Sequence, residues 1–152
     1  MAPAPNRFYQ DVSGNLHYIL LNYLKQHPIG KLYNAPFDVY LDDTNVFQPD
    51  LLFVSKARFS QFTDAGLNGA PDFVVEILSP KTAKLDLENK RLQYAKHGVQ
   101  ELWIIDPEIR TVAIHRFREN SSAPVAIHSE GDPLSTPILP GLIIDSREIF
   151  IQ

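Results

Sequence analysis

The feature that most constrains this chain is an apolar run, residues 73–78 (Phe-Val-Val-Glu-Ile-Leu), which carries one acidic residue, Glu76. The run is apolar on both faces of an extended chain, which predicts a central strand of a sheet. A carboxylate in such a strand is costly unless something pairs with it. A second acid, Asp50, directly precedes another apolar run, residues 51–54. Two converging carboxylates predict a site for a hard cation such as Mg²⁺, and the leading hypothesis is metal-assisted phosphodiester hydrolysis.

Composition narrows the class of protein. With 152 residues, 44% of them hydrophobic, the chain predicts one domain, residues 1–152, with a core of its own. There are no cysteines, which excludes disulfides and thiolate-bound zinc, and the five histidines show neither HxH nor HExxH spacing. The net charge of −4 argues mildly against a protein that coats nucleic acid, yet catalytic carboxylates in a nuclease would also add negative charge.

Hydrophobic periodicity predicts an α/β fold. Residues 10–26 repeat apolar side chains at helical spacing, and a second helix is expected to begin at Ser79–Pro80 and to end at His97–Gly98. Extended segments are expected at residues 32–41 (interrupted or edged by Pro36), 51–54, 73–78, 102–105, 111–117 and 125–128, with 102–105 and 111–117 forming a hairpin. This order describes a mixed sheet with helices packed on it. Trp103, Phe73 and Phe53 are expected in the core.

A lysine is missing from the strand of Glu76. Many metal-dependent nucleases carry a (D/E)XK signature, but the second residue after the acid is here Leu78. A helix that folds back over the sheet from about residue 83 would return Lys90 to the level of Glu76, since both paths measure roughly 10 Å. Asp86 lies one turn before Lys90 and could hold its amine in place. An ordinary surface salt bridge between Asp86 and Lys90 is the alternative interpretation.

Four stretches together resemble a known family: residues 48–54 (QPDLLFV), 70–80 (APDFVVEILSP), 86–99 (DLENKRLQYAKHGV) and 101–107 (ELWIIDP). They are similar to the Uma-two family, bacterial proteins described as restriction endonucleases and placed in the PD-(D/E)XK nuclease superfamily. The resemblance covers nearly the whole chain. It implies a restriction-endonuclease-like core, a mixed β-sheet flanked by helices.

The resemblance also implies roles for individual residues. Asp50 matches the aspartate of the family's PD motif, Glu76 matches the acid of its degenerate (D/E)XK strand, and Lys90 matches a lysine that has moved to the helix. Asp50, Glu76 and the carbonyl of Ile77 would then hold one Mg²⁺ or Mn²⁺, and Lys90 would orient the attacking water or neutralise the developing charge. DNA is the implied substrate. Asp72 is expected to shape the entry of the strand rather than to bind the metal.

Two departures from the family pattern bear on activity. Family members usually begin with a segment that carries a glutamate, and we expect that segment to be absent here, because the chain begins Met-Ala-Pro-Ala-Pro. They also commonly have His-Gln where this chain has Tyr9-Gln10. A missing strand would leave a sheet edge exposed, which favours pairing between subunits and hence a homodimer.

Three functions therefore stay open at the level of sequence. The first is a metal-dependent DNA endonuclease. The second is a non-catalytic relative that keeps the fold as a binding or regulatory module, and the third is a hydrolase of another phosphoester. The basic residues at 81, 84, 90, 91 and 96 gather on one predicted helix, either as a phosphate-facing stripe or as a solvated face. No apolar run is long enough for a membrane span and no signal-peptide core is present, so a cytoplasmic protein is expected.

Overall fold

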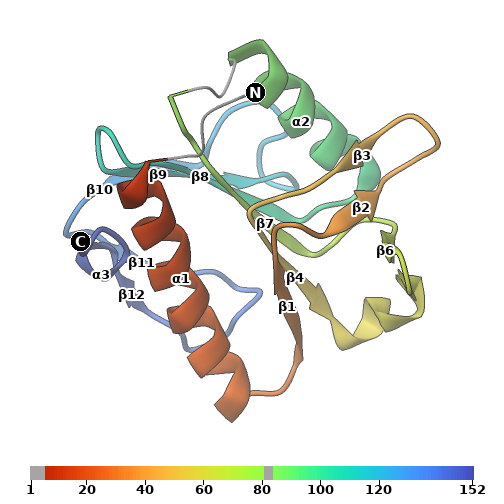
Figure 1. Cartoon of the computed structure of the whole chain (residues 1–152), viewed down its shortest axis with the longest axis horizontal. Helices are drawn as coiled ribbons and strands as arrows, with labels where there is room; N and C mark the ends of the chain where they lie inside the picture. Colours follow the sequence, from red (N-terminus) through yellow and green to blue (C-terminus); the bar gives the residue numbers. More distant parts are fainter. Residues whose placement is uncertain (1–5, 81–83) are drawn as a thin grey trace.

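The fold is built on a six-stranded mixed sheet, seen in the computed structural model, which describes residues 6–80 and 84–152 (Figure 1). Its strand order is β1-β4-β7-β8-β9-β10. The central pair β7 and β8 is parallel, and every other neighbouring pair is antiparallel. The strands span Gly30–Asn34 (β1), Leu51–Ser55 (β4), Phe73–Ile77 (β7), Glu101–Asp106 (β8), Thr111–Arg116 (β9) and Ala126–Ser129 (β10).

One face of this sheet is covered by helix α1, Arg7–Gln26, and by the C-terminal segment (Figure 1). Asn6 caps α1 by accepting a hydrogen bond from the Tyr9 N–H at 2.9 Å. The buried side of α1 packs on Phe73, Val75 and Ile77 of β7. The C-terminal segment adds the short elements β11 (Pro133–Leu134), β12 (Ile144–Asp145) and α3 (Ser146–Ile149).

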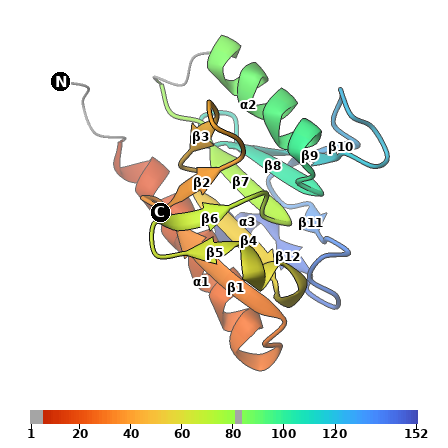
Figure 2. The same cartoon turned by 90° about the vertical axis from the view of Figure 1, so that its right-hand side faces the viewer.

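The opposite face is covered by helix α2 and by a small four-stranded sheet (Figure 2). The described part of α2 spans Lys84–His97 and ends at Gly98, whose φ of 97° is a conformation that side chains with a Cβ rarely adopt. The small sheet has the order β3-β2-β6-β5, with bounds Val46–Phe47 (β3), Asp38–Tyr40 (β2), Gly66–Asn68 (β6) and Phe62–Thr63 (β5). A 3₁₀ helix, Lys56–Gln61, joins β4 to β5.

Most of the expected elements are confirmed. The first helix, the apolar strands and the β8–β9 hairpin form as expected, and Trp103, Phe73 and Phe53 are buried. The start expected for the second helix is different: Ser79 and Pro80 are not helical, and the residues between Pro80 and Lys84 lie outside the described ranges. No helix within the described residues is long and apolar enough to cross a membrane.

One extended segment divides in a way that the sequence did not show. Residues 32–41 were expected as a strand interrupted or edged by Pro36, and the structure assigns its two halves to different sheets. β1 lies at one edge of the main sheet, beside β4, whereas β2 lies in the small sheet between β3 and β6. Pro36 has no N–H to donate to a ladder, which suits the break between them. The expected homodimer remains a prediction.

Candidate active site

The two acidic residues emerge side by side from adjacent strands. β4 and β7 pair with Leu51 opposite Val75 and Leu52 opposite Val74. Continuing this register by one residue places Asp50 opposite Glu76. Directly opposite residues point to the same face of a sheet, with their Cβ atoms about 5 Å apart. Here that face is the one covered by α2, since Val74 belongs to the cluster that packs there. The convergence expected from the sequence is therefore built into the sheet.

Asp50 directly precedes β4, and two donors hold its carboxylate. The N–H of Ile77 donates a hydrogen bond to Asp50 Oδ2 at 2.7 Å, and the hydroxyl of Tyr9 donates to Oδ1. Tyr9 comes from the first turn of α1, on the other side of the sheet. Because Asp50 precedes β4 rather than lying within it, a side chain from α1 can reach its carboxylate around the end of the sheet.

Glu76 is buried beneath α2 and has two partners on that helix. Its exposed fraction is 6%, the Nζ of Lys90 lies 3.5 Å from Oε1, and the hydroxyl of Tyr94 donates to Oε2 at 2.6 Å. Lys90 and Tyr94 are one turn apart, so both project from the same side of α2. Among the described residues, the ion-pair partner of Lys90 is thus Glu76 rather than Asp86. Lys90 lies beside Glu76, at the level that the lengths of the strand and the helix predict.

Burial dominates the electrostatics of the pair. It raises the pKa of Glu76 from its ordinary 4.5 to about 7, because the positive charge of Lys90 and the hydrogen bond from Tyr94 lower it less than desolvation raises it; the charge of Asp50 raises it further. Burial also raises the pKa of Asp50, against the lowering effects of Tyr9, Ile77 and Lys90. The single positive charge of Lys90 therefore does not offset the burial of the two carboxyl groups. A bound cation would add positive charge that favours their ionised forms.

The raised pKa of Glu76 predicts a pH-dependent stability. The folded protein binds this proton more tightly than the unfolded chain does, so the stabilising contribution is complete below pH 4.5 and is lost as the pH rises through about 7. Across that window we expect the free energy of unfolding of the wild type to fall relative to Glu76→Gln by on the order of 3 kcal/mol. Urea unfolding of both proteins at a series of pH values measures this difference, and a constant difference would contradict it.

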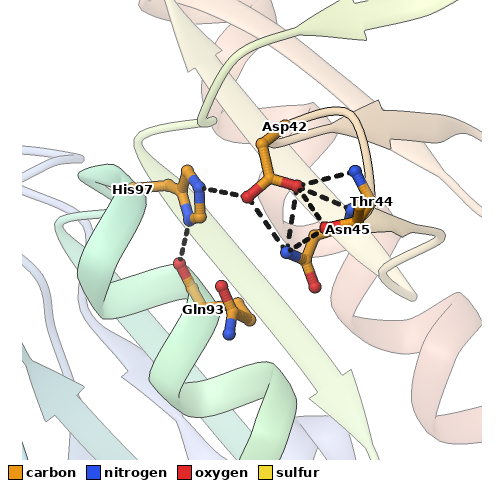
Figure 3. Close-up of polar contacts among 5 residues, drawn as sticks. All are labelled: Asp42, Thr44, Asn45, Gln93 and His97. Carbon is orange, nitrogen blue, oxygen red and sulfur yellow. Dashed lines mark hydrogen bonds and ion pairs between the residues drawn. The ribbon is translucent and has the colours of Figure 1, made fainter.

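The far end of α2 is tied to the turn between β2 and β3 (Figure 3). The ring of His97 lies with Nε2 2.9 Å from Asp42 Oδ2 and with Nδ1 2.8 Å from the carbonyl of Gln93. Asp42 Oδ1 also accepts hydrogen bonds from the backbone N–H groups of Thr44 and Asn45. The hydrogen bond from the Asn45 side chain and these backbone hydrogen bonds lower the pKa of the exposed Asp42 carboxyl. The contact between His97 and Asp42 therefore holds the C-terminal end of α2, the helix that carries Lys90 and Tyr94, against this turn.

Asp72, on the same face of the sheet as Glu76, has a structural role. Its carboxylate accepts from the Ser55 N–H at 2.6 Å and pairs with Arg58 Nε at 3.2 Å. Arg58 in turn donates to the carbonyls of Ala70 and Pro71. These contacts join the end of β4 to the start of β7, which agrees with the expectation that Asp72 shapes the strand entry.

A cavity of about 540 Å³ opens beside the site, lined by residues that include Tyr9, Leu78 and Lys84. Leu78, at the position of the lysine in the (D/E)XK signature, therefore contributes an apolar wall. A second cavity, about 590 Å³, lies among Tyr33, Phe37 and Phe62. Asp50, Glu76 and Lys90 are not among the described residues that line either cavity. The first cavity is connected to the acid pair through Tyr9, which lines it and donates a hydrogen bond to Asp50.

The basic residues of the second helix, for which a phosphate-facing stripe and a solvated face were both open, do not share one environment. Arg91 is buried, donates to the carbonyl of Ser121 at 2.8 Å and pairs with Glu88. Lys90 points to Glu76, whereas Lys84 and Lys96 are exposed. Lys81 lies outside the described residues.

Two tyrosines complete the site, and sequence reasoning did not assign their contacts. Tyr94 lies one turn after Lys90 on α2, and its hydrogen bond to Glu76 is not predicted by the sequence. Tyr9 was noted only as a departure from the family pattern, and its bond to Asp50 joins residues 41 positions apart. Within the described ranges there is no cluster of three or more His, Cys, Asp or Glu side chains suited to a metal. A metal here would need backbone, water or substrate oxygens besides the two carboxylates.

Comparisons with known proteins identify the family and the fold of the chain. Residues 1–147 match the family model described as "Uma2: Putative restriction endonuclease". The fold is similar to the crystal structure of "a putative nuclease belonging to DUF820 from Anabaena variabilis ATCC 29413", with a TM-score of 0.77 and 20% identity over 97% of this chain and 83% of that chain. At that identity the likeness shows the fold. No curated protein matches the chain. The resemblance and the α/β fold expected from the sequence are both confirmed.

Proposed function

Because the chain belongs to the Uma2 family of putative restriction endonucleases, we propose that it is a metal-dependent endonuclease that hydrolyses phosphodiester bonds in DNA. The observation that carries the proposal is the cross-strand pair of Asp50 and Glu76 with Lys90 beside it. An adjacent acid pair with one amine is an arrangement suited to binding a divalent ion and a phosphate together.

The donor set fits Mg²⁺ or Mn²⁺. Both ions prefer oxygen ligands, and the two carboxylates supply them. The carbonyl of Ile77 is the proposed third ligand. Its N–H donates to Asp50, and the N–H and C=O of one strand residue point to the same side. In the continued register the residue opposite Ile77 is Pro49, which has no N–H to donate to that carbonyl. The remaining positions would be filled by water and by phosphate oxygen.

The chain's own residues have separable roles in this reaction. When bound, the ion supplies a water of lowered pKa and positive charge beside the phosphate. Asp50 and Glu76 would hold the ion, and the Ile77 N–H keeps the Asp50 carboxylate oriented. Tyr94 fixes Glu76 through Oε2, which leaves Oε1 toward Lys90. Lys90 can orient the attacking water or neutralise the charge that develops on the phosphate.

A second candidate is a non-catalytic relative that binds DNA or a partner without turnover. It is favoured by Leu78, which replaces the strand lysine by an apolar side chain, and by the Tyr9 hydroxyl, which engages Asp50. In this case Lys90 would serve only to neutralise Glu76 in the folded protein.

The two candidates differ in a direct test. We expect the purified protein to convert supercoiled plasmid to nicked or linear DNA with Mg²⁺ or Mn²⁺, and to lose this activity with EDTA. Calorimetry should show Mn²⁺ binding that Asp50→Asn weakens. Metal binding without cleavage of single- or double-stranded DNA would favour the non-catalytic relative, or a hydrolase of another phosphoester, which a panel of phosphodiesters would reveal. No metal binding and no cleavage would overturn the proposal.

A further inference from the structure

Both oxygens of Asp50 are already engaged. Oδ2 accepts from the Ile77 N–H at 2.7 Å, and Oδ1 accepts from the Tyr9 hydroxyl. The two donors differ in kind. The Ile77 N–H belongs to the rigid backbone of a central strand, whereas Tyr9 is a side chain in the first turn of a helix that covers the other face. Of the two, only the tyrosine can leave by changing its side-chain conformation.

The Tyr9 hydroxyl also interacts electrostatically with both carboxylates, Asp50 and Glu76. Burial is the main cause that raises its pKa, followed by the hydrogen bond to Asp50 and by the negative charges of Asp50 and Glu76. In the structure the hydroxyl acts as a hydrogen-bond donor to the carboxylate. A donor at Oδ1 partly does what a cation would do, since each stabilises the negative charge of Asp50.

The Tyr9 side chain also has room to move. It lines the cavity of about 540 Å³ that contains Leu78 and Lys84, so a rotated ring has space beside the site. By contrast, the hydroxyl of Tyr94 is enclosed beneath α2, because Tyr94 is fully buried. The two tyrosines thus hold the two acids in different ways, one enclosed and one beside open space.

We propose that Tyr9 sets the metal affinity of this site by competing with the divalent ion for Asp50, so that metal binding displaces its hydroxyl. The inference rests on the proposed function, because it requires a metal site at Asp50 and Glu76. In the metal-free protein the tyrosine satisfies the carboxylate. On metal binding its hydroxyl leaves Oδ1 and turns toward the cavity.

The test is the affinity for Mn²⁺, measured by calorimetry at constant pH. Tyr9→Phe keeps the ring and removes only the competing donor. A hydrogen bond to a charged group contributes about 1.5 kcal/mol or more, so we expect Tyr9→Phe to bind Mn²⁺ about tenfold more tightly than the wild type. The matched control is Tyr23→Phe, on the same helix, whose hydroxyl donates to the carbonyl of Pro140 at 2.6 Å. Its Mn²⁺ affinity should equal that of the wild type.

A spectroscopic readout follows the displacement itself. Adding Mg²⁺ should change the near-ultraviolet absorbance of tyrosine in the wild type and in Tyr23→Phe, and this change should be absent in Tyr9→Phe. Wild-type metal binding with an unchanged affinity in Tyr9→Phe would overturn the inference and leave the proposed function intact. Weaker binding in Tyr9→Phe would also overturn it, by showing that Tyr9 assists the metal. If neither protein binds Mn²⁺, the metal site and this inference both fail.

Discussion

Glu76→Gln should abolish metal-dependent DNA cleavage while making the folded protein more stable at neutral and alkaline pH. In the proposed function Glu76 is one of two anionic ligands, and its loss would weaken the hold on the ion and the effect of the ion on the phosphate. We therefore expect cleavage to fall by about a thousandfold or more. The glutamine side chain can still accept the Tyr94 hydrogen bond. The variant also removes a carboxylate whose pKa burial raises to about 7, and with it the cost of ionising that group in the folded state.

The opposite signs of these two effects make the experiment decisive. A residue kept only for folding would not lower the stability of the folded protein when it ionises, and replacing it would not raise that stability. Replacing a functional residue commonly does raise it. Plasmid cleavage with Mg²⁺ and Mn²⁺ measures the first effect, and urea unfolding above neutral pH measures the second. Glu119→Gln is the control, because Glu119 is exposed and lines a different cavity. Retained cleavage in Glu76→Gln would remove Glu76 from the site.

Lys90→Met should reduce cleavage by about a hundredfold, a loss typical of removing one group that stabilises charge in a transition state. Methionine keeps most of the apolar stem and removes the ammonium, which lies 3.5 Å from Glu76 Oε1. Since the charge of Lys90 lowers the pKa of Glu76, the variant should raise that pKa further. Glu76 would then be protonated at neutral pH, so Mn²⁺ binding should weaken there and recover as the pH is raised.

Lys96→Met is the matched control for this prediction, because Lys96 lies on the same helix and is exposed. Single-turnover cleavage at several pH values separates the two contributions of Lys90. Weak metal binding is relieved at high pH, whereas the loss of transition-state stabilisation persists. Cleavage by Lys90→Met that equals the wild type would support the simple alternative that Lys90 only forms a salt bridge.

The location of the acids could be predicted because their neighbours are so apolar. Glu76 stands inside a strand that is buried on both faces, and Asp50 directly precedes another such strand. The end of α2 could also be predicted locally, because Gly98 follows its last residue and adopts a positive φ. The length of a helix and of a strand fixed the level of Lys90 relative to Glu76. None of these inferences required knowledge of which segments pair.

Contacts between segments distant in the sequence could not be predicted in this way. Asp86 lies one turn from Lys90, and a local rule favoured that pair, but the sheet below α2 offers Lys90 a buried carboxylate in Glu76. A charge gains more from a partner in a buried, poorly solvated site than from one at the surface, so the tertiary contact prevails. In the same way, backbone pairing assigned β1 and β2 to different sheets, although both read alike as extended chain.

The sequence by itself determined the fold class, the family and the two acids, since these depend on side-chain periodicity and on motifs within short segments. Only the tertiary structure decided how those acids are satisfied: Asp50 by Tyr9 and the Ile77 N–H, and Glu76 by Lys90 and Tyr94. The physical reason is that a hydrogen bond depends on distance and direction between atoms, and strand register and helix packing set these across 41 residues for Tyr9 and 18 for Tyr94.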